Sequence, residues 1–430
     1  MHGLNDLLRP SLARFAFGPL ALALGLAACG GDDEGLPPFS PGTGATSGSG
    51  GSGGSGGTSG TSGTGGSGAQ VTELFTRGTY AVGYRKIEVS YRPPGEAVDR
   101  VLPLHVWYPA RAGGELPATY AVGGIVSLPS SGVLAAPALA EGAPFPLAVY
   151  SHGSGGEGLI GYPYAELFAS QGWVVAAPNH VGNTALDEFA NMAAPRVRVA
   201  LDRPRDVSAI IDAFASGLSG DALAGVTRAD RVFLFGHSFG AYTALTGGGV
   251  DVDVAKLRAS CAALGECAAL DTPGVEAGFQ AGFGDARVAA IAAQAPALVP
   301  VYGQGQLAAL KVPTLLMTAR LDKTTIEAEN AAPAWAGLAN PGDLRVDLPQ
   351  GGHFSFVSIC NDLDATLLES FQPGSAEDGC GPAFTPVAEA VPALAAYLVG
   401  FARWHVLGES KWQPLLRGAP LHPSFVVSTH

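Results

Sequence analysis

Two patterns of apolar residues recur along the chain after position 140. Short continuous apolar runs predict buried strands, whereas apolar residues spaced three or four positions apart predict helices. Strands are expected in the ranges 146–153, 173–180, 231–236, 286–296, 312–322 and 344–354, and helices in the ranges 162–172, 203–216 and 386–408. Pro204 is expected in the first turn of the second helix, where proline is tolerated. Because strands and helices alternate, the pattern predicts a parallel sheet with helices on both faces.

Two earlier stretches extend this sheet. The sequences YAVGYRKIEVSY (80–91) and VLPLHVWYPA (101–110) are expected to form antiparallel strands at its front edge. The whole pattern predicts one α/β domain with a mostly parallel sheet of about eight strands. The segment 247–285 connects an expected helix to the next strand, and we expect it either to cap the functional site or to form one of its walls.

The start of the chain has the features of an export signal. Arg9 and Arg14 precede an apolar stretch over residues 15–28 that is too short to span a bilayer comfortably. The sequence LAAC at 26–29 resembles a bacterial lipobox, which implies cleavage before Cys29 and lipidation of its thiol. The alternative is an ordinary signal peptide with an incidental cysteine. A lipidated Cys29 predicts an exported protein on a membrane of a bacterial cell envelope, facing the periplasm or the exterior.

Composition changes sharply after the signal. Residues 30–70 are dominated by glycine, serine and threonine, have almost nothing to bury and are expected to form a flexible tether. The range 71–430 is then the folded domain, and an apolar content of 47% permits a sizeable core. The chain has 37 acidic and 24 basic residues, a formal net charge of −13, and no basic run. Nucleic-acid binding is therefore not expected, because it depends on neutralising phosphates.

Four cysteines lie in the expected domain: Cys261, Cys267, Cys360 and Cys380. An even number of cysteines in an exported chain predicts two disulfides, for which three pairings are possible. The local pairing Cys261–Cys267 with Cys360–Cys380 is favoured, because each pair then brackets a short loop. Buried free thiols are the alternative. No pair has metal-ligand spacing with nearby histidines, so no metal site is expected.

The pattern G-x-S-x-G occurs three times, at 50–54, 53–57 and 236–240. The first two matches lie in the expected tether and have neither a strand before them nor a helix after them. The third, GHSFG, has both, which is the arrangement that a nucleophile elbow requires. There the serine occupies a strained turn, and the flanking glycines let the strand and the helix approach closely. We expect Ser238 to be a catalytic nucleophile. A spectator serine in a tight turn is the alternative.

A serine hydroxyl needs a base to take its proton, and that base needs an acid to orient it. Four histidines follow the serine, namely His353, His405, His422 and His430. Only His353 follows a short strand in a glycine-rich loop, so it is the expected base. Asp322 comes directly after the strand in 312–322, where sites of open α/β sheets gather, and it is the expected acid. A core histidine and a helix N-cap are the respective alternatives.

A developing oxyanion needs two N–H donors. One is expected from Phe239, the residue after the nucleophile. The other is expected from Ser154 in the loop SHGSGG (151–156), whose glycines would let the backbone approach a substrate. A plain glycine turn is the alternative for this loop.

Taken together, these motifs resemble the α/β-hydrolase superfamily, and more narrowly the bacterial relatives of platelet-activating-factor acetylhydrolase and dienelactone hydrolase. The matching stretches lie at 102–110, 146–156, 178–184, 203–212, 236–240, 318–325 and 351–356. The resemblance implies an acyl-enzyme mechanism through Ser238, His353 and Asp322, with no metal or organic cofactor. Dienelactone hydrolases have a cysteine nucleophile, and the serine in this chain argues against dienelactone as the substrate.

The expected function is therefore a serine carboxylic-ester hydrolase that acts on lipid-like or other small esters. Its expected partners are the ester substrate and the membrane that holds the lipid anchor. A polyester or cutin-type hydrolase is one alternative, and it would need a shallow, open site. The alternative from a different class is a non-catalytic surface lipoprotein on a hydrolase fold, because a fold does not guarantee a function.

Overall fold

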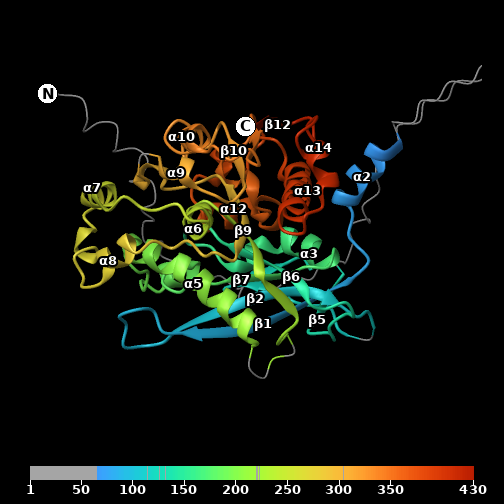
Figure 1. The fold of residues 1–430 in the computed structure, drawn as a ribbon, viewed down its shortest axis with the longest axis horizontal. Coiled ribbons are helices and arrows are strands. Elements are labelled where there is room, and N and C mark those ends of the chain that lie inside the picture. Colours follow the sequence, from blue (N-terminus) through green and yellow to red (C-terminus); the bar gives the residue numbers. More distant parts are fainter. Residues whose placement is uncertain are drawn as a thin grey trace, which may run out of the picture.

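The structure is a computed structural model that describes residues 65–430, apart from residues 114, 125, 131, 219, 220, 222 and 304. The expected signal, Cys29 and most of the expected tether lie outside the described residues. Helix α2 (Gly65–Phe75) begins within the range 30–70 that the composition assigns to the tether. The central sheet of the domain follows from β1 onward (Figure 1).

A ten-stranded sheet forms the centre of the molecule, in the order β12-β11-β10-β9-β8-β6-β7-β2-β1-β5 (Figure 1). Its strands are β1 (Ala81–Tyr91), β2 (Arg100–Ala110), β5 (Val133–Ala135), β6 (Phe145–Ser151), β7 (Val174–Pro178), β8 (Thr227–His237), β9 (Val288–Gln294), β10 (Thr314–Ala319), β11 (Leu344–Leu348) and β12 (Val426–Thr429). The strands from β7 through β6, β8, β9 and β10 to β11 are parallel. The expected front strands β1 and β2 are antiparallel to each other, and β2 is antiparallel to β7.

The expectation of about eight strands is corrected to ten. All eight expected strands form, and β5 and β12 are added at the two edges of the sheet. Strand β5 has three residues and pairs with β1, whereas β12 has four residues and pairs antiparallel with β11. Such short edge strands bury little, so no long apolar run marks them in the sequence. The strands β3 (Tyr120–Val122) and β4 (Val126–Leu128) pair as a separate sheet.

Helices cover both faces of the sheet, and β8 shows how its residues divide between them. Val232 and Leu234 belong to the core cluster that contains α5 (Arg196–Ser216) and α6 (Phe239–Gly247). Phe233 and Phe235 belong to the opposite cluster, with α3 (Tyr162–Ser170) and α13 (Val387–His405). Successive strand residues point to opposite faces, so a strand buried on both sides is apolar throughout. Helix α13 is long and apolar enough to cross a membrane, but it is largely buried in this core.

The prediction for Pro204 is wrong. Helix α5 begins at Arg196, so Pro204 lies inside the helix rather than in its first turn. A proline has no N–H to donate to the carbonyl four residues earlier, which here belongs to Ala200. The hydroxyl of Tyr242, on α6, donates to that carbonyl oxygen at 3.1 Å. A side chain of the neighbouring helix thus supplies the hydrogen bond that the proline removes.

The segment 247–285 folds into α7 (Val254–Leu264) and α8 (Val275–Gln280), with the short turn η3 (Cys267–Ala269) between them. Helix α8 contacts α5, and α7 contacts the turn η4 (Val299–Val301). Figure 1 shows both helices at the side of the molecule beside α5. Both expected disulfides form: Cys261–Cys267 joins α7 to η3 within this segment, and Cys360–Cys380 closes a loop before α13.

Short helices complete the connections. They are α4 (Ala185–Phe189), α9 (Gln306–Ala309), α10 (Ala331–Gly337), α11 (Ile359–Asp362), α12 (Ala365–Phe371) and α14 (Gln413–Leu416), with the single turns η2 (Gly158–Gly161), η5 (His353–Phe356), η6 (Ser375–Glu377) and η7 (Ser410–Trp412).

Candidate active site

Ser238 lies in the sharp turn between β8 and α6. Its backbone has φ 57° and ψ −116°, in a region that residues with a side chain rarely adopt. Its N–H donates to the carbonyl of Gln294 at 2.9 Å, which joins the turn to the end of β9. The strained turn at this position is the geometry of a nucleophile elbow.

Two glycines make this turn possible. A Cβ on Gly236 would lie 2.5 Å from the backbone of Gly240 and 2.6 Å from the carbonyl oxygen of Ser151. A Cβ on Gly240 would overlap that same oxygen. Real Cβ atoms do not approach other atoms so closely, so both positions require glycine. The motif G-x-S-x-G is therefore a packing requirement between β6, β8 and α6.

The structure brings Ser238, His353 and Asp322 together in one hydrogen-bonded chain. His353 Nε2 lies 2.9 Å from Ser238 Oγ, and His353 Nδ1 lies 2.9 Å from Asp322 Oδ2. All three residues are buried. Asp322 follows β10, His353 follows β11, and Ser238 follows β8, so each comes from the carboxyl end of a parallel strand. The distances place the imidazole between a hydroxyl and a carboxylate, as proton transfer requires.

Several donors surround the carboxylate of Asp322. It accepts from the N–H groups of Thr324 at 2.8 Å and Thr325 at 2.6 Å, and from the Thr325 hydroxyl at 2.7 Å. Burial works to raise the pKa of Asp322, but His353 and the bonds from Thr325 outweigh it and lower that pKa below its ordinary value. Asp322 is therefore ionised at neutral pH and holds the Nδ1 proton of His353.

The pKa of His353 is raised above its ordinary value. Burial works to lower this pKa, because it disfavours the charged ring, but the charge of Asp322, its hydrogen bond and the charge of Asp378 outweigh that effect. A base whose charged form is supported in this way can accept the proton of a serine hydroxyl. Asp378 was not predicted from the sequence.

His237, the residue before Ser238, also contacts His353. Its Nε2–H donates to the carbonyl of His353 at 2.9 Å, and the two rings lie 4.7 Å apart. Burial and the neighbouring His353 lower the pKa of His237 to about 3, so this ring is neutral at pH 7. The sequence analysis did not predict a role for His237. It occupies a position of G-x-S-x-G at which the motif allows any residue.

The expected oxyanion loop passes close to Ser238. A Cβ on Gly153 would lie 3.4 Å from the Cβ of Ser238. The next residue, Ser154, is half-buried, and its hydroxyl accepts from the Asn183 side chain at 3.1 Å. Phe239 is the first residue of α6, so its N–H precedes the first hydrogen bond of the helix. Both expected donors therefore belong to backbone segments next to the serine.

A buried arginine, which was not predicted as a site residue, holds this loop. Arg203 on α5 donates to the carbonyl oxygens of His152 and of Gly153, the latter at 3.1 Å, and to Asn183 Oδ1 at 2.6 Å. Burial lowers the pKa of Arg203 to about 9, so it remains charged at pH 7. Because it binds two consecutive carbonyls of the loop, Arg203 fixes the direction of that backbone.

A second hydrogen-bonded set of serine, histidine and aspartate lies at the end of β6, next to this loop. Ser151 Oγ is 2.9 Å from His180 Nε2, and His180 Nδ1 is 2.8 Å from Asp206 Oδ2. All three side chains are fully buried, and Asp206 also accepts from Arg100 at 2.7 Å. Burial and two nearby arginines hold the pKa of His180 well below its ordinary value. Ser151 is the last residue of β6 and does not lie at a strained strand-to-helix turn, so we assign these three residues a structural role at the end of β6.

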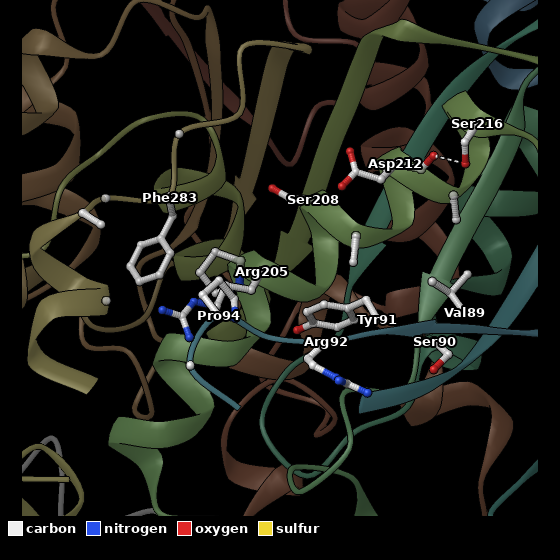
Figure 2. A pocket seen from close by; sticks show the side chains of 18 of the residues that line it. Val89, Ser90, Tyr91, Arg92, Pro94, Arg205, Ser208, Asp212, Ser216 and Phe283 are labelled. Atoms are coloured by element: carbon white, nitrogen blue, oxygen red, sulfur yellow. Dashed lines mark hydrogen bonds between the residues drawn. The ribbon is translucent and has the colours of Figure 1, made fainter. Parts of the chain in front are cut away.

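A groove and a smaller pocket lie in the described part of the molecule, and residues outside the candidate triad line both. The larger, of about 1180 Å³, is an open groove between β1, α5 and α8. Figure 2 shows Tyr91, the last residue of β1, and Arg205 and Asp212 of α5 among the side chains that line it. The other, of about 420 Å³, lies beside η4 and α10. Neither cavity is lined by Ser238, His353 or Asp322.

Comparisons with known proteins agree with the fold. No protein-family model matches the chain, and no curated protein matches it. Among solved structures, it is similar to a ferulic acid esterase from Streptomyces cinnamoneus, with 22% sequence identity and a TM-score of 0.55. The similarity covers 81% of this chain and 97% of the esterase. At this identity the likeness shows a shared fold, and the chain has the expected α/β-hydrolase type of architecture.

Proposed function

We propose that this chain is a serine carboxylic-ester hydrolase that acts on lipid-like or other small esters. The observation that carries the proposal is the buried hydrogen-bonded chain from Ser238 through His353 to Asp322, with 2.9 Å at each step. Its occurrence at a strained strand-to-helix turn supports catalysis over a structural role, because strain of this kind persists where function needs it. The ferulic acid esterase of similar fold is consistent with the same reaction class.

Acylation would begin at Ser238. Its Oγ attacks the ester carbonyl while His353 Nε2 takes the hydroxyl proton, and Asp322 stabilises the imidazolium that forms. The negative charge moves to the carbonyl oxygen, where the N–H groups of Phe239 and Ser154 bind it. His353 then gives its proton to the leaving alcohol, and an acyl-enzyme remains.

Deacylation would repeat these steps with water. His353 takes a proton from the water, the resulting hydroxide attacks the acyl carbonyl, and the same N–H groups hold the oxyanion. When the tetrahedral intermediate collapses, His353 returns the proton to Ser238 Oγ and the acid is released. All proton transfers and all negative charge are thus handled by side chains and backbone groups of this chain.

Exposed apolar side chains in the segment beside the oxyanion loop favour a substrate with an apolar part. The segment after β7 exposes four large apolar side chains: Val181 at 40%, Leu186 at 47%, Phe189 at 76% and Met192 at 67%. The same segment joins the loop through the bond from Asn183 to Ser154 and through a backbone bridge between Thr184 and Gly156. Exposed large apolar side chains beside a site can contact the apolar part of a substrate.

The exposed apolar side chains also support the alternative of a polyester hydrolase, because a polymer substrate could bind to them. A polymer would also need the segment 247–285 to leave the site uncovered. In this segment, α7 packs on η4 and α8 packs on α5. The proposal further includes export of the chain, lipidation of Cys29 and attachment to a membrane of the bacterial envelope. The two disulfides are consistent with an oxidising compartment.

The proposal is tested by ester hydrolysis with the full-length protein. We expect turnover within a series of p-nitrophenyl esters from acetate to palmitate, with methyl ferulate as an aryl ester. Ser238→Ala should lower kcat by about 10⁶-fold, because the nucleophile is lost. A fluorophosphonate probe should label the wild type and leave Ser238→Ala unlabelled. Ser370→Ala, at an exposed serine of α12, is the matched control and should retain both turnover and labelling.

The chain-length profile would then separate small esters from lipid-like ones, and release of acid from a polyester film would test the polymer alternative. A folded wild-type protein that neither turns over any ester nor reacts with the probe would contradict the proposal. That outcome would favour a tethered binding protein on a hydrolase fold.

A further inference from the structure

We infer that Asp378 is a positioning residue for the proposed catalytic triad, because it fastens the loop that carries His353 to the loop that carries Asp322. The inference rests on the proposed function and adds a residue that the sequence motifs do not contain. Asp378 comes 25 residues after His353, inside the loop that the Cys360–Cys380 disulfide closes.

The buried carboxylate of Asp378 binds both loops at once. Its Oδ1 accepts from the N–H of His353 at 2.9 Å and from the N–H of Lys323 at 2.9 Å. Its Oδ2 accepts from the hydroxyl of Thr324 at 2.7 Å. Lys323 and Thr324 directly follow Asp322, so one carboxylate connects the backbone of the base to the backbone next to the acid. Hydrogen bonds to an ionised acceptor are stronger than those between neutral groups.

The main chain at His353 is held from two sides. Its N–H donates to Asp378, and its carbonyl accepts from His237. The next N–H, of Phe354, donates to the backbone carbonyl of Asp378 at 2.9 Å. With both peptide groups fixed, the imidazole has little freedom to leave the line between Ser238 and Asp322. A displacement of about 1 Å in such an arrangement can cost about 100-fold in rate.

The position of Asp378 is itself constrained. A Cβ on Gly352 would overlap the backbone of Asp378, so the two segments pack main chain against main chain. The loop containing Asp378 is closed by Cys360–Cys380, and the N–H of Cys380 donates to the carbonyl of Ser375 at 3.0 Å. The loop thus brings a fixed acceptor to the base rather than a mobile side chain.

Asp378 also adds charge to the site. The ionisable groups that bear on His353 are Asp322, Asp378 and His237, and the pKa of His237 is lowered to about 3. The two carboxylates both favour the imidazolium form, whereas His237 is neutral at pH 7. Replacing Asp378 with asparagine removes one negative charge, so the pKa of His353 should fall and the acid limb of kcat/KM should move to lower pH.

Three variants of the full-length protein test the inference. Asp378→Ala removes every acceptor and should lower kcat by about 100-fold with little change in KM. Asp378→Asn keeps one oxygen for the two N–H groups, and should restore kcat to within about tenfold of the wild type while still lowering the pKa of His353. Asp364→Asn is the matched control, because Asp364 lies in the same disulfide loop but is exposed and caps α12. It should change neither kcat nor the pKa of His353.

The pKa of His353 is measured by NMR on protein labelled with ¹⁵N-histidine, with its signal assigned by its loss in His353→Gln. This readout does not depend on turnover. An inactive wild type would therefore overturn the proposed function, whereas an unchanged pKa of His353 in Asp378→Asn would overturn the inference. A folded Asp378→Ala with wild-type kcat, or one that loses only thermal stability, would also overturn it. If Asp378→Ala does not fold, the pKa of His353 in Asp378→Asn still decides the test.

Discussion

At the scale of single residues, the site depends on close backbone contacts around Ser238. The serine has a positive φ, and its neighbours Gly236 and Gly240 bring β8 and α6 against the end of β6. Both glycines lie against the carbonyl of Ser151, the last residue of β6 and the first of the expected oxyanion loop. The motif therefore sets the distance between Ser238 and the loop that is proposed to bind the oxyanion.

This close contact predicts that Gly240→Ala lowers the free energy of unfolding by about 3 kcal/mol or more, because the new Cβ would overlap backbone that cannot move aside. Gly303→Ala is the control, since the nearest atom there is on the flexible side chain of Gln306, at 3.0 Å. It should cost less than about 1 kcal/mol. Urea denaturation measures both, and equal losses would contradict the role assigned to Gly240.

Residue-scale reasoning from the sequence predicted the members of the site that follow strands. Ser238, His353 and Asp322 each lie in a short motif whose place after a strand could be recognised, and the structure brings them within hydrogen-bonding distance. The sequence motifs did not identify Arg203, His237 or Asp378 as residues of the site. Their contacts join segments far apart in the chain, as when Arg203 binds the loop that contains Gly153. A local sequence pattern cannot predict contacts between residues that are far apart in the chain.

At the scale of elements, α5 shows a helix that tertiary contacts complete. Pro204 removes one hydrogen bond from its interior, and the sequence pattern therefore suggested a helix beginning near that residue. The helix instead begins at Arg196 and continues through the proline, because the hydroxyl of Tyr242 bonds the freed carbonyl of Ala200. The bond also fastens α5, which carries Arg203, to α6, which follows Ser238.

A double-mutant cycle tests this compensation. Tyr242→Phe should lower the free energy of unfolding by about 1–2 kcal/mol, because it leaves a buried carbonyl without its donor. In a Pro204→Ala background the same change should cost much less, because the N–H of the new alanine can donate to Ala200. Tyr164→Phe, which removes a hydroxyl bond to the carbonyl of Phe356, should cost the same in both backgrounds. A cost of Tyr242→Phe that does not depend on residue 204 would contradict the explanation.

At the scale of the whole molecule, the domain and its N-terminal segment are joined through α2. Leu74 is fully buried in the same core as α13, and Glu73 pairs with Arg403 of α13 at 2.8 Å. Helix α2 therefore packs on the face of the domain that α13 covers. A lipid anchor at Cys29 would hold the domain to a membrane through the chain that ends at this helix.

The proposed anchor predicts that the protein incorporates an alkyne-tagged fatty acid when it is produced in a bacterial host that processes lipoproteins. Cys29→Ser should abolish incorporation, because the hydroxyl does not replace the modified thiol. Acyl chains on Cys29 should also keep the wild type in the membrane fraction after a salt wash, since their attachment is hydrophobic. An unlabelled wild type, or equal labelling of Cys29→Ser, would favour the ordinary signal peptide.

The order of the eight main strands of the sheet, and the expectation that Ser238, His353 and Asp322 form one site, followed from sequence alone. Apolar periodicity reports burial along one element, and catalytic motifs are local in the chain, so both can be recognised without a structure. Tertiary structure decided the edge strands, the start of α5 and the residues that hold the site in place. Arg203 and Asp378 act on backbone groups distant in sequence, and only folding brings a charged side chain to those groups.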